Sequence, residues 1–202
     1  ASDMLNLAEF AGLVGPAVHR LPRVVYFHEN QLTYPVRRAD PRDLHFAFTN
    51  LASARAAEAV WFNSAFHRER FLAAMDELLR RMPDASLAGA VARIAKKSSV
   101  QSPGIDAFGP RGPRPAGPLR VLWAARWEHD KNPDDLFRAV EILSRRSVAF
   151  RLSVIGEQFR RAPTVFAWAR ERFAAVIDRW GFQATRDEYR AALQEADVIV
   201  ST

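Results

Sequence analysis

Short apolar runs alternate with longer amphipathic segments along most of the chain. The apolar runs are rich in β-branched and aromatic residues and predict strands at 23–27, 60–62, 98–101, 119–124, 150–155, 176–180 and 197–200. Between them, helical spacing of apolar residues predicts helices over 3–14, 43–58, 65–82, 86–96, 133–147, 163–175 and 185–196. Strands that alternate with helices at this spacing indicate βαβ units, so the predicted fold class is α/β with mostly parallel sheets.

Capping residues support several of these helix boundaries. Asn63 or Ser64 is placed to cap the helix that starts at 65, and Thr185 with Glu188 has the spacing of a capping box. Asn132 is suited to an N-cap and Pro133 to the first helical position.

A change in composition separates the chain into two parts. Residues 103–118 contain five prolines and four glycines, which neither a helix nor a strand interior tolerates. This segment is predicted to be a linker between a domain at 1–102 and a second domain at 119–202.

Composition narrows the class of protein without naming a function. The hydrophobic fraction of 49% is ordinary for a globular protein, and no run reaches the roughly 18 apolar residues of a membrane span. The first twenty residues lack the pattern of a secretory signal, and the absence of cysteine excludes disulfides and thiolate chemistry. A cytoplasmic protein that makes no membrane contact is therefore expected. The net charge of +6 fits either a solvated basic surface or a polyanionic partner such as RNA.

Polar side chains gather where predicted strands end, which is where ligands bind in open parallel sheets. The segment YFHENQLTYP at 26–35 carries His28, Glu29, Asn30 and Gln31 directly after an apolar run. A lone histidine is more often structural, but buried polar groups need partners, and a hydroxyl-rich sugar or nucleoside would supply them. This segment is predicted to form the rim of a cleft.

Two later strand ends are also candidates. In RWEHDKNP at 126–133, Arg126 and Lys131 can direct two cations at one diphosphate, whereas capping explains only 132–135. Gly156 and Glu157 follow the strand at 150–155. Glu157 suits a ribose or a base, although a lone glycine is usually a simple turn and the carboxylate fits a solvated turn as well. No motif supports a metal site or a serine hydrolase.

Five motifs in order, YFHENQLTYP, WFNSAF, RWEHDKNP, SVIGEQF and ADVIVST, resemble the tRNA-queuosine α-mannosyltransferase family. The likeness runs from about residue 3 to the last residue. The broader similarity is to retaining glycosyltransferases of the GT-B fold, which have two Rossmann-like domains.

The resemblance implies transfer of mannose from GDP-mannose to queuosine in tRNA with retained configuration, without a metal or other cofactor. It places Arg126 and Lys131 on the donor diphosphate and Glu157 with Gly156 near the nucleotide or sugar. His28 and Glu29 become the candidate catalytic residues. The acceptor-side residues are Asn30, Gln31, Asn63 and Ser64.

The resemblance also implies a chain that lacks both ends of the family's catalytic region. A first βαβ segment with a Gly-rich loop and a later Glu-x7-Glu motif are both absent from the sequence, so little transferase activity is expected of the chain alone.

Three alternatives stay open. One is a GT-B glycosyltransferase with another donor or acceptor, and another is a nucleotide-binding protein of a different α/β family. The third is a non-catalytic RNA-binding module, against which no RRM or KH signature appears. Trp61, Trp123 and Trp180 lie at strand positions and are predicted to pack in the core rather than stack on bases.

Overall fold

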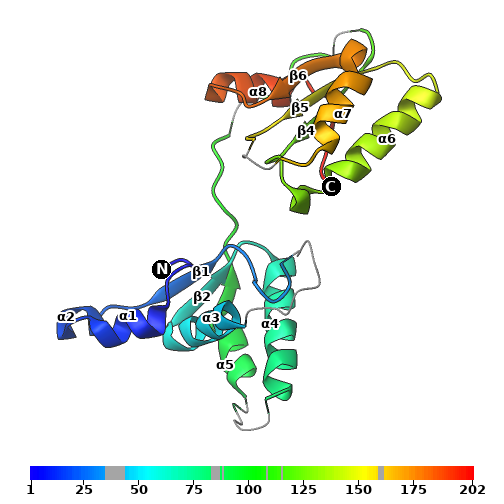
Figure 1. Ribbon diagram of the computed structural model, residues 1–202. Coiled ribbons are helices and arrows are strands. Elements are labelled where there is room, and N and C mark those ends of the chain that lie inside the picture. Colours follow the sequence, from blue (N-terminus) through cyan, green and yellow to red (C-terminus); the bar gives the residue numbers. More distant parts are fainter. Residues whose placement is uncertain (35–43, 83–86, 88, 108, 115, 159–161) are drawn as a thin grey trace. The chain divides into compact units, whose positions relative to one another are not determined.

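The computed structural model describes residues 1–34, 44–82, 87, 89–107, 109–114, 116–158 and 162–202. The chain divides into two compact units, Ala1–Ile105 and Asp106–Thr202. Each unit has its own parallel sheet and its own helices (Figure 1). The boundary between the units falls inside the Pro/Gly-rich segment at 103–118.

The first unit is built on a three-stranded parallel sheet of order β1-β2-β3. Its strands are β1 (Val24–Phe27), β2 (Ala59–Phe62) and β3 (Ser98–Val100). Its helices are α1 (Leu7–Leu13), α2 (Pro16–His19), α3 (His45–Ala56), α4 (Ala65–Arg80) and α5 (Ala90–Lys96).

Aromatic side chains form the centre of the first unit's core. Phe27 of β1, Phe62 of β2 and Phe71 of α4 are fully buried, with ring centroids 4.8 to 5.5 Å apart. The period of two along a strand turns the neighbouring Trp61 to the other side, where it is 38% exposed. The prediction that Trp61 packs in the core is therefore wrong, whereas Trp123 is buried as predicted.

The second unit has a four-stranded parallel sheet of order β6-β5-β4-β7. Its strands are β4 (Leu119–Ala124), β5 (Phe150–Ile155), β6 (Ile177–Gly181) and β7 (Val198–Val200). The α-helices are α6 (Pro133–Arg145), α7 (Val165–Arg172) and α8 (Arg186–Glu195), and the 3-10 turns are η1 (His129–Lys131) and η2 (Ala174–Val176).

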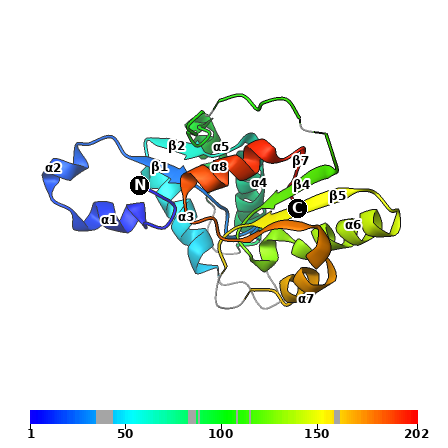
Figure 2. The same ribbon diagram turned by 90° about the horizontal axis from the view of Figure 1, so that it is seen from above.

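Both faces of this second sheet are covered, which explains why its central strands are apolar at successive positions. Val121 and Trp123 of β4 pack with the residues of α6 and α7. Leu122, between them in sequence, packs with Ala192 of α8. Helices α6 and α7 lie on one side of β4 and β5, and α8 lies on the other (Figure 2).

Ion pairs attach the segment after Ile105 to the second unit. Arg111 and Arg114 both bind Asp197, which directly precedes β7, and Asp106 pairs with Arg186. The hydrogen bond from Arg111, with help from the Arg120 backbone, holds the pKa of Asp197 well below its usual range. The described part of 106–118 is therefore fastened to the second unit by charged contacts.

The observed elements follow the predicted order, and the differences lie mostly at their ends. Ser64 caps α4 by accepting a hydrogen bond from the His67 backbone, and Thr185 and Glu188 form the predicted capping box. The short helix α2 lies outside the predicted helices, since the sequence pattern predicts only a helix over 3–14 in this region.

Asn132 departs from its predicted role. It occupies the N-cap position of α6 but has a left-handed backbone (φ 46°), and its side chain makes no capping hydrogen bond to the helix. Instead its amide donates to the Asp135 carboxylate at 2.7 Å. Asn132 ends the 3-10 turn η1 with this left-handed backbone, a conformation that asparagine adopts more readily than most residues.

Candidate functional site

The first unit brings the polar residues after β1 and β2 to one edge of its sheet. Because β1 and β2 are parallel and Phe27 is in register with Phe62, the segments that follow them are neighbours. The Asn63 side chain donates a hydrogen bond of 2.9 Å to the His28 carbonyl, so the two strand ends are directly linked.

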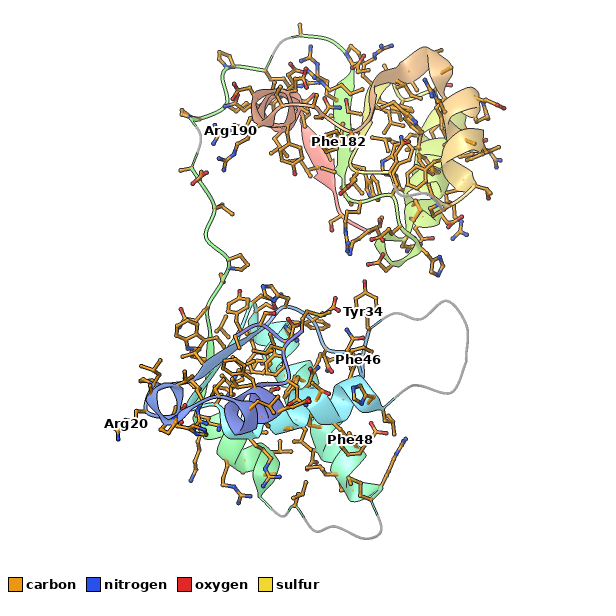
Figure 3. The ribbon with its side chains drawn as sticks, turned by 60° about the vertical axis from the view of Figure 1, so that its left-hand side comes forward. Arg20, Tyr34, Phe46, Phe48, Phe182 and Arg190 are labelled. Carbon is orange, nitrogen blue, oxygen red and sulfur yellow. The ribbon has the colours of Figure 1, made fainter. Side chains whose placement is uncertain are left out.

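A pocket of about 240 Å3 lies at this edge of the sheet. Four of the predicted residues line it, namely His28, Asn30, Asn63 and Ser64. Glu29 and Gln31 are not among its lining residues, and their side chains hydrogen-bond to each other at 2.6 Å. Figure 3 shows Tyr34, another lining residue, projecting from the loop that follows β1.

His28 is oriented by a carboxylate from a distant part of the sequence. Its Nδ1 lies 3.0 Å from Oδ1 of Asp3, which is buried, whereas the His28 side chain is largely exposed. The second Asp3 oxygen accepts from the Glu29 backbone at 3.3 Å. A proton on Nδ1 leaves Nε2 as a hydrogen-bond acceptor in the neutral ring, so this pair can receive a hydroxyl proton of a ligand.

Two buried nitrogens beside the pocket lack hydrogen bonds. Asn30 and His67 are 4% and 8% exposed, and neither Asn30 Nδ2 nor His67 Nε2 has a partner among the described residues. Leaving such groups unpaired is costly, and in native proteins the exceptions need an explanation. Both residues line the pocket.

The protonation state of His67 follows from its surroundings. Burial lowers the pKa of His67, against the opposite influence of the Glu29 carbonyl and the Asp3 carboxylate. Its Nδ1 lies 3.0 Å from Oδ1 of Asn63, an acceptor, so Nδ1 carries the proton of the neutral ring. Among the described residues, the pocket wall therefore holds two nitrogens without a hydrogen-bond partner, His67 Nε2 and Asn30 Nδ2.

In the second unit, the strand order reverses beside β4. Strands β5 and β6 lie on one side of β4 and β7 lies on the other, which creates the switch point where doubly wound sheets bind ligands. The loop with Arg126 and Lys131 follows β4 at this place. Thr202, after β7, donates to the Lys131 carbonyl at 2.5 Å and accepts from Trp123 Nε1 at 3.1 Å.

Each of the two predicted diphosphate-binding cations has an acidic neighbour. Arg126 lies 3.2 Å from Glu128, and Lys131 lies 2.7 Å from Asp130. Both cationic side chains are partly exposed, at 50% and 35%. These contacts are local, and they leave the cations at the surface of the switch-point loop.

Gly156 makes a close backbone contact that only glycine permits. A Cβ on Gly156 would lie 1.8 Å from the Ala125 carbonyl oxygen, and the backbone has φ of +150°. The neighbouring Trp127 amide donates to the Glu157 carbonyl at 2.9 Å. This glycine thus joins the loops after β4 and β5. The Glu157 side chain is exposed and has no partner in the described part of the chain.

Some site residues were missed by sequence reasoning. Nothing in the sequence pairs Asp3 with His28, since 25 positions separate them. His67 lies in a segment with helical spacing, and this spacing indicates only a structural role for it. The topology alone placed Thr202 against the loop after β4. Within the described ranges, no group of three or more potential ligands could hold a metal ion, and no helix is long and apolar enough to cross a membrane.

Comparisons with solved structures support the fold. A mutant of Staphylococcus aureus TarM, in complex with Fondaparinux, alpha-GlcNAc-glycerol and UDP, matches 89% of this chain and 32% of its own length, with a TM-score of 0.61 and 13% identity. The apo lipopolysaccharide outer core galactosyltransferase WaaB matches 99% of this chain and 54% of its own, with a TM-score of 0.54 and 14% identity. These likenesses confirm the predicted α/β fold of GT-B type.

Sequence comparisons identify the family. Residues 1–105 match the family model described as tRNA-queuosine alpha-mannosyltransferase N-terminal. The whole chain is 33% identical to the tRNA-queuosine alpha-mannosyltransferase of Drosophila melanogaster, and it spans 56% of the length of that relative. Together these matches show that the chain belongs to the tRNA-queuosine alpha-mannosyltransferase family.

Proposed function

We propose that this chain is part of a glycosyltransferase that moves mannose from GDP-mannose to queuosine in tRNA, with retention of configuration. The observation that carries the proposal is the position of Arg126 and Lys131 on the loop after β4, at the switch point of a Rossmann-like sheet. Family membership supplies the reaction class, and this loop supplies the charge that the reaction needs.

The cations on this loop suit a nucleoside diphosphate. Transfer of a sugar from its nucleotide leaves a diphosphate whose growing negative charge must be stabilised. An arginine offers a planar fork and a lysine a mobile point charge, and a diphosphate can accept from both. In this proposal they take the charge-neutralising role that a metal ion has in other transferases.

The tight turn at Gly156 brings Glu157 beside the same loop. Because the Glu157 carbonyl is tied to the Trp127 amide, its side chain starts close to the residues that follow Arg126. A carboxylate there, which has no partner among the described residues, suits the hydroxyls of the ribose or of the sugar.

The pocket of the first unit suits the acceptor. His28, held by Asp3, can accept a hydrogen bond from a hydroxyl through Nε2 and so orient it. Asn30, Asn63 and Ser64 provide further polar groups at the pocket, and Glu29 with Gln31 lies next to it. A tRNA acceptor would also give the net charge of +6 a role, and it implies a cytoplasmic protein.

A thermal-shift panel tests the donor. GDP-mannose and GDP are expected to raise the unfolding temperature of the chain, whereas UDP and ADP sugars should not, since a ligand stabilises only the state that binds it. Arg126→Ala and Lys131→Ala should abolish the shift. Arg138→Ala is the matched control, because it removes a surface arginine from an ion pair of the same unit, and it should keep the shift.

The transfer itself is tested by nucleoside mass spectrometry. Queuosine-containing tRNA is incubated with GDP-mannose and the full-length protein, and queuosine should gain the mass of one hexose that an α-mannosidase removes. Stabilisation by a UDP sugar instead would point to another donor. RNA binding with no response to any nucleotide sugar would favour the non-catalytic alternative.

A further inference from the structure

Phe66 is an exposed ring at the rim of the first unit's pocket. It is the second residue of α4 and is 72% exposed, whereas the nearby Phe62 and Phe71 are fully buried. Single exposed aromatics are common on protein surfaces. This one lines a pocket that also contains two buried nitrogens, Asn30 Nδ2 and His67 Nε2, for which the described ranges offer no hydrogen-bond partner.

Arg70 lies one helical turn after Phe66 and lines the same pocket. Its guanidinium carbon is 5.8 Å from the centroid of the Phe66 ring. Arg80 of the same helix and its C-cap residue Arg81 each pair with an acid four residues earlier, but Arg70 has no hydrogen bond or ion pair with any described residue. Within the described part of the chain, no acidic side chain pairs with this cation at the pocket.

The start of α4 adds to the positive character of this rim. The backbone amides of Ala65 and Phe66 have no carbonyl within the helix to bind, and helix N-termini favour anions. The pocket volume of about 240 Å3 is roughly that of eight liquid-water molecules, at about 30 Å3 each. One base or one ribose fits such a space.

Proteins build sites for single-stranded nucleic acid from exposed aromatic rings, guanidinium groups and a few polar groups. Bases stack on aromatic side chains, arginine binds the backbone phosphate, and polar groups read base edges or hydroxyls. A purely apolar partner would leave Asn30 Nδ2 and His67 Nε2 unpaired, whereas a nucleotide offers both a donor and an acceptor.

We propose that Phe66 and Arg70 bind one unpaired nucleotide of the RNA acceptor, with its base stacked on Phe66 and its phosphate on Arg70. This inference rests on the proposed function, because it names the part of the acceptor that the pocket holds. It adds a stacking residue and a phosphate-binding residue that the sequence patterns did not indicate.

Binding of a fluorescently labelled RNA stem-loop with an unpaired seven-nucleotide loop tests the proposal by fluorescence anisotropy over a series of salt concentrations. Phe66→Ala should weaken binding about 10-fold, the loss typical of one stacked base, and Phe66→Trp should restore it. Arg70→Ala should weaken binding and reduce the slope of log K against log salt by about 0.7, and Arg70→Lys should keep that slope.

Two variants serve as matched controls. Phe182→Ala removes a ring of similar exposure, 68%, from the second unit (Figure 3), and Arg80→Ala removes a paired arginine from α4 itself. Both should bind RNA like the parent chain. Unchanged RNA affinity in Phe66→Ala, or a loss equally large in Phe182→Ala, would overturn the proposal.

The outcome separates this proposal from the donor proposal. Phe66→Ala should leave the thermal shift by GDP-mannose intact, since the ring is assigned only to the acceptor. Suppose that RNA binding depends on Phe66 and Arg70 but GDP-mannose causes no thermal shift. This result would support the site and contradict the proposed function. A thermal shift by GDP-mannose, together with RNA binding that does not depend on Phe66 and Arg70, would support the transferase and contradict this site.

Discussion

Both units place polar residues directly after parallel strands, but the hydrogen-bond and ion-pair partners of these residues differ between the units. In the first unit, residues after β1 and β2 line a pocket where Asn30 Nδ2 and His67 Nε2 have no hydrogen-bond partner among the described residues. In the second unit, Arg126 and Lys131 already have acidic neighbours on an exposed loop. The pocket of the first unit therefore has hydrogen-bonding groups available to a ligand. In the second unit, a ligand must compete with carboxylates for the two cations.

The two units also differ in whether side chains or backbone contacts form the site. The first unit forms its pocket with side chains from two strand ends and α4, whereas the second joins two loops through backbone contacts at Gly156. Side-chain substitutions should therefore alter binding in the first unit. In the second unit, the substitution of Gly156, whose backbone makes the loop contact, should alter stability most.

The largest effect is expected from Phe71→Ala in the core of the first unit. Phe71 is fully buried against Phe27 and Phe62, so removing its ring should cost about 3–5 kcal/mol of unfolding free energy. Phe66→Ala, on the same helix but exposed, should change it by less than about 0.5 kcal/mol. Hydrogen exchange of peptides covering α4 measures both, and a comparable cost for the two would refute the assignment of Phe66 to the pocket rim.

Gly156→Ala should destabilise the second unit by about 2–4 kcal/mol, because the new Cβ collides with the Ala125 carbonyl and the φ of +150° disfavours any side chain. Gly117→Ala is the control, since Gly117 has φ of +134° but open space around it. Urea unfolding followed by tryptophan fluorescence reports on this unit, which holds four of the five tryptophans. Equal losses in the two variants would mean that φ, and not the loop contact, matters.

A smaller effect is expected from pH through His67. Burial lowers the pKa of His67, so below its ordinary value of 6.5 the unfolded chain binds a proton that the folded chain resists. The stability of the first unit should be fully present above pH 6.5 and decline as pH falls below that value. The decline should be weaker in His67→Gln. Glu58, whose pKa the Arg23 ion pair lowers from 4.5 to about 2, affects stability only at lower pH.

The smallest effect is expected on the stability of the second unit when its two site cations are removed. Arg126→Ala and Lys131→Ala break partly exposed ion pairs, which contribute little, so unfolding free energy should change by less than about 0.5 kcal/mol. Urea unfolding checks this directly. A large loss would show that these residues hold the fold and are not available for a ligand.

Much of the architecture was predictable because local patterns and tertiary packing agree here. Apolar runs such as 119–124 could be recognised as buried strands, and caps such as Ser64 and Thr185 marked helix starts. Trp61 and Asn132 were mispredicted because composition does not say which face a strand residue takes or which backbone conformation a turn imposes.

The alternation of strands and helices, the family, and the residue types at each strand end could all be recognised in the amino-acid sequence. These depend on local periodicity and on motifs that are contiguous in the chain. The fold was needed to show that Asp3 binds His28, that Phe66 and Arg70 line a pocket with Asn30, and that Gly156 packs against Ala125. Such contacts join residues far apart in sequence, and parallel pairing and packing bring them together in space.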